Sequence, residues 1–150
     1  MKYTLLKNQH HVDDPVYLVS GVYKGITFPQ RSTFIPGDDL GLISQLPSYK
    51  FKLDISGFLS LTVAFRLIQQ PALGNITVVP AAYIQHPAYK NRKLILKGRR
   101  LTNGPCDTTI QSVPFYIHSG TKFWLDLWQM NSHNINMRLE YCYMGVRVDD

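Results

Sequence analysis

The sequence contains little cysteine: Cys106 and Cys142 are the only thiols among 150 residues. Two cysteines do not make a disulfide framework, and no Cys-x-x-Cys or Cys/His spacing of a zinc site is present. The small disulfide-stapled domain is therefore excluded as a fold class, and no structural metal is expected. Whether Cys106 and Cys142 pair is left open.

Long apolar runs are also absent. No stretch approaches the roughly 20 apolar residues that cross a membrane as a helix. The first residues, Met1–Lys7, lack the apolar stretch of a signal peptide. We therefore expect no membrane contact and a protein made in the cytoplasm without a leader, unless a leader has been lost from this sequence.

The motifs of common catalytic sites are missing as well. There is no Gly-x-Ser-x-Gly elbow, phosphate-binding loop or dinucleotide fingerprint. The five histidines are dispersed among predicted turns and loops, which gives no metal cluster. Asp54 and Asp126 both fall on polar sides of predicted strands, so a buried acid pair of the glycosidase type has no candidates. The sequence predicts no catalytic residues and no cofactor, although a long-range serine or cysteine triad stays open.

Acidic residues are fewer than basic ones, 10 against 16, which gives a formal net charge of +6. Such an excess suits an anionic partner, such as nucleic acid, an acidic glycan or a membrane surface. The alternative is a mildly basic surface without such a partner. The densest basic run, residues 90–100, is interrupted by apolar residues 94–96, which is typical of a strand with charged flanks.

What the sequence does contain is a two-residue rhythm from Tyr49 to Ile68. One alternate set is apolar apart from a glycine, and the other is mostly polar. This is the period of strands with one face in a core and one in solvent. Because the stretch is too long for one ordinary strand, we predict a bend or short hairpin at Ser56–Gly57.

The last third repeats this rhythm, with a strand predicted over residues 109–116 and two more after it. A change of phase at Gly145 predicts a β-bulge there, and residues 40–46 are predicted as one helical turn capped by Asp38 or Asp39. The inward-facing sets predicted for the last two strands are Phe123, Leu125 and Leu127, then Met137, Leu139, Tyr141 and Tyr143.

About eight to ten strands can be counted, spaced about 8–12 residues apart, with no linker and no internal repeat. This arrangement indicates an all-β chain that forms one domain over residues 1–150. The predicted fold is an antiparallel two-sheet β-sandwich of the jelly-roll type.

Two segments resemble the C1q/TNF-like jelly roll, a family of trimer-forming domains. Residues 49–61 are similar to its paired alternating strands around a small residue and a glycine, and residues 112–127 to its strand, Gly-plus-polar turn and apolar strand. Secreted members usually follow a leader and a stalk, which this sequence lacks. The resemblance therefore implies a viral or phage structural member, which needs no leader.

Four apolar residues fall on the side opposite their core sets. They are either covered within the monomer or buried by neighbouring subunits, since exposed apolar patches mark interfaces. The resemblance to a trimeric family favours the second interpretation. The predicted oligomer interface consists of Phe58, Ile68, Trp124 and Trp128.

The irregular segments Arg31–Leu46 and His86–Arg92 are expected to face outward, because long loops in compact domains often bind ligands. The residues predicted to bind a receptor or glycan there are Arg31, Asp38, Asp39, His86, Tyr89 and Arg92.

The first functional hypothesis is a non-enzymatic virion protein (capsid, spike or decoration) that self-assembles as a trimer or a closed shell. Its partners would be further copies of itself, a host receptor or glycan, and possible nucleic acid at the basic surface. The alternative is a soluble lectin- or C1q-like trimeric ligand-binding module with an extracellular setting. An enzyme on a sandwich scaffold is the third.

Overall fold

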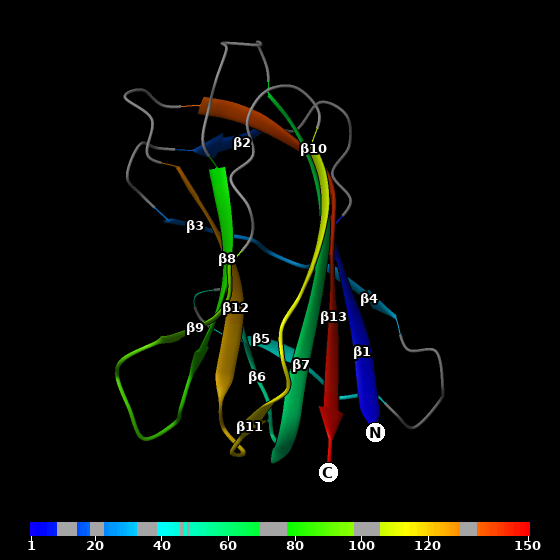
Figure 1. The fold of residues 1–150 in the computed structure, drawn as a ribbon, viewed down its shortest axis with the longest axis vertical. Coiled ribbons are helices and arrows are strands. Elements are labelled where there is room, and N and C mark those ends of the chain that lie inside the picture. The colour runs from blue at the N-terminus through cyan, green and yellow to red at the C-terminus, as the bar shows by residue number, and fades with distance from the viewer. Residues whose placement is uncertain are drawn as a thin grey trace.

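The computed structural model describes residues 1–8, 15–18, 23–32, 39–45, 47, 49–69, 78–97, 106–129 and 135–150, which form two antiparallel sheets (Figure 1). The seven-stranded sheet contains β1 (Lys2–Asn8), β2 (Pro15–Leu18), β4 (Gln30–Ser32), β7 (Gly57–Gln69), β10 (Cys106–Gln111), β11 (Phe115–Ile117) and β13 (Ile135–Asp149). The six-stranded sheet contains β3 (Tyr23–Gly25), β5 (Ile43–Gln45), β6 (Lys50–Lys52), β8 (Val78–Gln85), β9 (Lys93–Lys97) and β12 (Lys122–Gln129).

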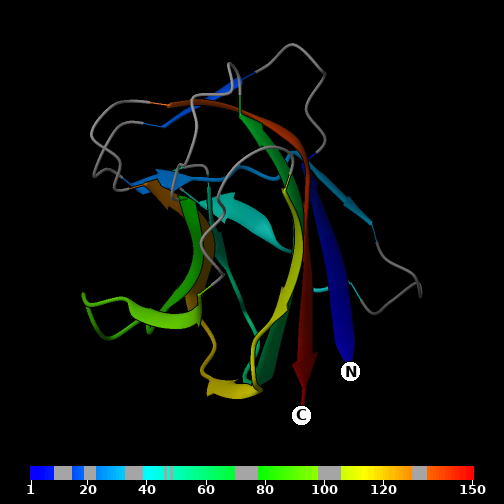
Figure 2. The same ribbon diagram turned by 45° about the horizontal axis from the view of Figure 1, so that its top comes forward.

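The strand order confirms the predicted two-sheet sandwich. The larger sheet runs β10-β7-β13-β1-β4, with β11 paired to β7 and β2 to β13. The smaller runs β5-β6-β12-β8-β9, with β3 paired to β12. Figure 2 shows the two layers from a second direction, with β1 and β13 side by side in both views. The described residues include no helix, and so none that could span a membrane.

The core lies between the sheets and is built by the predicted alternation. Leu59, Leu61, Val63 and Phe65 of β7 are 0–1% exposed, and the residues between them face outward or are half-buried. The inward set predicted for β12 is also confirmed: Phe123, Leu125 and Leu127 are all buried in the same cluster.

The predicted break at Ser56–Gly57 marks the passage from one sheet to the other. β6 belongs to the six-stranded sheet and β7 to the seven-stranded one, so the two halves of the rhythm face each other across the core. Leu53 N–H donates to the carbonyl of Thr121, and Gly120 N–H donates to the carbonyl of Leu53. These bonds hold the crossing segment against the turn that leads into β12.

The inward set predicted for β13 is wrong at Tyr141 and Tyr143. The register with β7 shifts between Leu139 and Tyr141, so the bulge lies upstream of Gly145. Because the extra residue inverts the alternation before Tyr141, both tyrosines face outward and stack on each other, with ring centroids 5.2 Å apart. The inward residues are Cys142, Met144, Val146 and Val148.

Cys142 is a free, buried thiol, so it does not pair with Cys106. Burial raises the pKa of this thiol well above its ordinary value, which makes it an inert apolar packing residue.

The helical turn predicted for residues 40–46 is also wrong. β5 pairs there with β6. Asp39 acts within the connection to it: its carboxylate accepts hydrogen bonds from the Thr4 hydroxyl at 2.9 Å and from Gly41 N–H at 3.0 Å. A strand partner thus replaces the intrahelical bonds that the local pattern suggested.

Gly57 provides a test of the sheet crossing. Its φ is 156°, and a Cβ there would lie 2.4 Å from the backbone oxygen of Asp149. We expect Gly57→Ala to lower the free energy of unfolding by about 2–3 kcal/mol. The new methyl group would strain the backbone of residue 57 and would also displace the backbone of Asp149. Gly41→Ala, with φ of 63° and open space around its Cβ, should cost only about 1 kcal/mol. Urea unfolding followed by fluorescence measures both, and equal losses would contradict the clash.

Candidate functional site

The outer face of the six-stranded sheet carries a cluster of aromatic rings and cations. On β12, Trp124 and Trp128 point away from the core because Phe123, Leu125 and Leu127 point into it. Pairing places Tyr83 of β8 opposite Trp124, and Tyr23 of β3 opposite Trp128. We call this surface the aromatic–cation face: Tyr23, Tyr49, Lys50, Tyr83, Arg92, Trp124 and Trp128.

The rings of this face support one another. Tyr83 stacks on Trp124 with ring centroids 5.8 Å apart, and Tyr23 stacks on Trp128 at 5.7 Å. Tyr23 and Tyr83 meet edge to face at 6.3 Å. These spacings lie in the favourable range for aromatic pairs, so the rings form one continuous packed surface.

Two cations lie over these rings. The Lys50 ammonium is 4.1 Å from the centre of the Trp124 ring. The Arg92 guanidinium lies 4.1 Å from the centre of Tyr83 and 4.7 Å from that of Tyr23. All three distances allow cation–π attraction.

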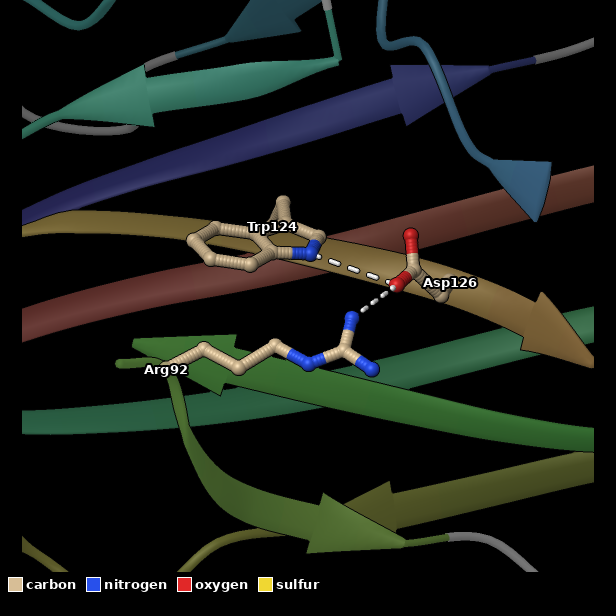
Figure 3. A network of polar contacts seen from close by, with 3 residues as sticks. All are labelled: Arg92, Trp124 and Asp126. Atoms are coloured by element: carbon tan, nitrogen blue, oxygen red, sulfur yellow. Dashed lines mark hydrogen bonds and ion pairs between the residues drawn. The ribbon is translucent and has the colours of Figure 1, made fainter. Parts of the chain in front are cut away.

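Asp126 lies beneath the cations at the centre of β12. Its carboxylate accepts a hydrogen bond from Trp124 Nε1 at 3.3 Å and forms an ion pair with Arg92 Nη1 at 3.5 Å (Figure 3). Asp126 falls on the outward side of β12, as expected from the sequence, but it is only 3% exposed, because the aromatic rings of the same face cover it.

Burial controls the protonation of this network. Desolvation raises the pKa of Asp126, against the lowering effects of the Trp124 hydrogen bond and the Arg92 charge. Burial also raises the pKa of the Tyr83 phenol, although the charge of Arg92 opposes it. The Trp124 hydrogen bond and the charges of Arg92 and Lys50 thus favour the ionised carboxylate, and burial opposes it.

Two hollows open on the aromatic–cation face, and Arg92 lines the first of them. One, of about 140 Å³, is lined by Tyr49, Lys50, Gln85, Lys90, Arg92 and Trp124. The other, of about 190 Å³, is lined by Tyr23, Val79, Ala81, Tyr83, Leu94, Lys97 and Trp128. The first brings three cations together beside an indole, which suits an anionic group.

The four residues of the predicted interface do not share one surface. Trp124 and Trp128 lie on the aromatic–cation face, whereas Phe58 lies on β7 of the other sheet and is 46% exposed. Ile68 is also on β7, where the structure describes its backbone but not its side chain. Trp124 is 3% exposed within a single chain, packed with Tyr83 and Tyr49, so its ring needs no neighbouring subunit to cover it.

The predicted loop residues are likewise separated. Arg31 donates to the backbone oxygen of Leu42. Hydrogen bonds from Gly41 N–H and the Thr4 hydroxyl lower the pKa of Asp39. These contacts fasten residues 39–42 to β4 and β1, while Asp38 lies outside the described residues.

His86, Tyr89 and Arg92 come from the connection between β8 and β9. His86 and Tyr89 contact each other with ring centroids 4.9 Å apart at the end of the sandwich, whereas Arg92 reaches the aromatic–cation face. Their predicted role in ligand binding stays a prediction. Sequence reasoning does not single out Lys50, Tyr83 or Tyr23 as site residues. The signal in the sequence that could have indicated this face is the Trp-x-Asp-x-Trp alternation of β12, which places two indoles and a carboxylate on one side of the strand.

The described residues hold no group of three or more histidine, cysteine, aspartate or glutamate side chains that could bind a metal ion. The Arg92–Asp126–Trp124 network contains no nucleophile with an adjacent base. This geometry is better suited to binding than to covalent chemistry.

No protein-family model and no curated protein matches the sequence, but solved structures match it over its whole length. Eiger TNF from S. frugiperda superposes with a TM-score of 0.60 at 8% identity, covering 100% of this chain and 94% of that one. The globular domain of zebrafish complement 1qA gives 0.59 at 6% identity, covering 100% and 98%. Murine APRIL gives 0.55 at 14% identity, covering 98% and 100%.

The chain has the C1q/TNF-like jelly-roll fold. The resemblance of residues 49–61 and 112–127 is thereby confirmed at the level of the fold. At these identities the likeness concerns the jelly roll alone. The viral or phage origin and the virion role expected from the sequence find no support among these structures.

Arg92 can be tested through the pH dependence of stability. A raised pKa means that the folded chain binds the proton of Asp126 more tightly than the unfolded chain does. The stability that this proton contributes is therefore lost as the pH rises from the ordinary pKa of 3.8 through the pKa in the folded chain. Arg92→Ala removes the offsetting cation and should cost about 1–2 kcal/mol at pH 7 but clearly less at pH 3.

The matched control is Arg147→Ala, which removes the exposed 2.9 Å ion pair with Asp149 and should cost at most about 0.5 kcal/mol at either pH. Urea unfolding at both pH values measures the difference. A cost for Arg92→Ala that does not change with pH would contradict the role given to the carboxylate.

Proposed function

We propose that this chain is a non-enzymatic, self-associating recognition module that binds an acidic saccharide through the aromatic–cation face. The observation that carries the proposal is the cluster of Lys50, Lys90 and Arg92 around one hollow beside Trp124. Sulfate or carboxylate groups pair with such cations, and a sugar ring can stack its C–H groups on the adjoining aromatic rings.

The charge distribution around this face supports an anionic ligand. Lys97 lines the second hollow, and the acid at the centre of the face, Asp126, is buried and already paired with Arg92. A long saccharide that spans both hollows would meet cations at each end and rings between them. The basic excess of the whole sequence would assist its approach.

Self-association would use the opposite surface, the outer face of the seven-stranded sheet. Phe58 and the stacked Tyr141 and Tyr143 lie there, and Ser60 and Ala64 of β7 are small residues between them. Aromatic residues are enriched in interface cores, and the charges of Arg147 and Asp149, which lie beside Ser60 and Phe58 on the same face, already pair with each other at 2.9 Å. The resemblance to trimer-forming jelly rolls makes a homotrimer the proposed state.

This proposal follows the ligand-binding alternative rather than the virion role. The likeness of the fold to Eiger TNF, complement 1qA and APRIL supports a recognition role, for which we propose an extracellular setting. A protein receptor, in place of a glycan, would be indicated if no saccharide bound.

The saccharide can be tested with a heparin-derived sulfated tetrasaccharide and its desulfated counterpart, by calorimetry at low and physiological salt. We expect the sulfated form to bind more tightly, with an affinity that falls as salt rises. Lys50→Gln should weaken binding by about five- to tenfold, since it removes one charge-assisted contact.

The control is Lys24→Gln, which removes the same charge from an exposed position on β3 and should change the affinity less than about twofold. Equal losses in the two variants, or equal binding of the sulfated and desulfated forms, would refute the site.

The interface can be tested by light scattering. We expect the wild-type protein to have three times the 17.2 kDa mass of one chain. Phe58→Asp should give monomers with an unchanged circular dichroism spectrum, because this side chain is exposed in the single chain. The control Val113→Asp, at a residue 77% exposed in the connection between β10 and β11, should remain trimeric. A monomeric wild type would overturn self-association.

A further inference from the structure

A separate pocket of about 320 Å³ opens between the β8–β9 hairpin and β11, at the end of the sandwich. Figures 1 and 2 show this hairpin standing away from β11. The lining includes Ile84 and Ile117, which are 5% and 2% exposed and belong to the main hydrophobic core. An apolar group entering here would therefore contact the core itself.

The rim of the pocket is a chain of aromatic contacts. Ring centroids lie 4.9 Å apart for Tyr89 and His86, 5.1 Å for His86 and His118, and 5.4 Å for His118 and Tyr116. Tyr116 in turn meets Phe58 at 5.2 Å. Rings that hold one another in this way lose little freedom when a ligand binds.

One cation stands over the apolar wall. The Lys93 ammonium lies 4.2 Å from the centre of the Phe115 ring, and Lys93 forms no ion pair with another described residue. No aspartate or glutamate is among the residues that line the pocket. The side chains of Asn91 and His118, which also line it, make no hydrogen bond to another described residue. Several donors are thus available beside an unpaired positive charge.

We propose that this pocket binds a small organic monocarboxylate with a flat apolar body. The body would lie between Phe115 and the two isoleucines, and the carboxylate would pair with Lys93 beside Asn91. The volume is at the lower end of the range of about 300–1,000 Å³ for ligand sites. A bare inorganic anion would leave the apolar wall in water, and a neutral ligand would leave the cation unpaired.

This inference does not depend on the saccharide proposal, because Lys50 and Trp124 do not line this pocket. His86 and Tyr89, expected from the sequence to bind a ligand, lie at its rim.

The test is a titration with 4-phenylbutyrate and its neutral analogue 4-phenylbutyramide, followed by amide chemical shifts. Ligands of this size at typical efficiencies should bind with dissociation constants of about 0.1–1 mM. We expect shifts confined to residues 84–93 and 115–121, and at least fivefold weaker binding of the amide.

Lys93→Gln should remove the advantage of the acid, whereas Lys24→Gln, the same change at an exposed position of β3 outside this pocket, should retain it. Asn91→Asp adds a like charge at the rim, so it should weaken the acid but not the amide.

Equal affinities of acid and amide in the wild type would overturn the proposal, as would equal losses in the two lysine variants. A third result would also overturn it: amide shifts of residues 115–118 that change with protein concentration, together with loss of ligand binding when the protein self-associates. The pocket would then be an interface between copies.

Discussion

The antiparallel pairing of β7 with β13 is the constraint on which the other parts of the molecule depend. The two longest strands pair from Met137 opposite Gln69 to Asp149 opposite Phe58, and together they supply most of the buried core residues described on the larger sheet. Because side chains alternate across a strand, their register determines which residues form the core. It also determines which residues the molecule presents on its outer surface.

A second level of order is electrostatic. Asp126 occupies an outer position on a central strand, where an unpaired carboxylate would be costly. The hydrogen bond from Trp124 and the ion pair with Arg92 compensate for this cost, and they draw the connection between β8 and β9 onto the sheet. Such a buried pair contributes little net stability. Its effect here is to hold the rings and cations of the aromatic–cation face in one arrangement.

Much of the fold could be predicted from the sequence, because the alternation from Tyr49 to Ile68 directly reports a one-sided strand. The alternation does not say which sheet a strand joins, so the quartet of Phe58, Ile68, Trp124 and Trp128 was expected on one surface although it spans two. The position of a bulge depends on the partner strand, which the sequence pattern does not identify, so the pattern indicates Gly145 whereas the shift lies between Leu139 and Tyr141. Burial of Asp126 depends on Tyr83 and Arg92, which are distant in sequence, and no periodicity reveals it.

The adjacency of β1 and β13 has a consequence for chain connectivity. Lys2 lies opposite Val148, so both ends of this sequence lie side by side at one end of the sandwich (Figure 1). A linker of a few residues would join Met1 to Asp150, and the chain could then be opened at the exposed turn at residues 87–88 without separating any paired strands. The order in which the strands follow one another is therefore not imposed by their contacts, and a circularly permuted version is compatible with the same architecture.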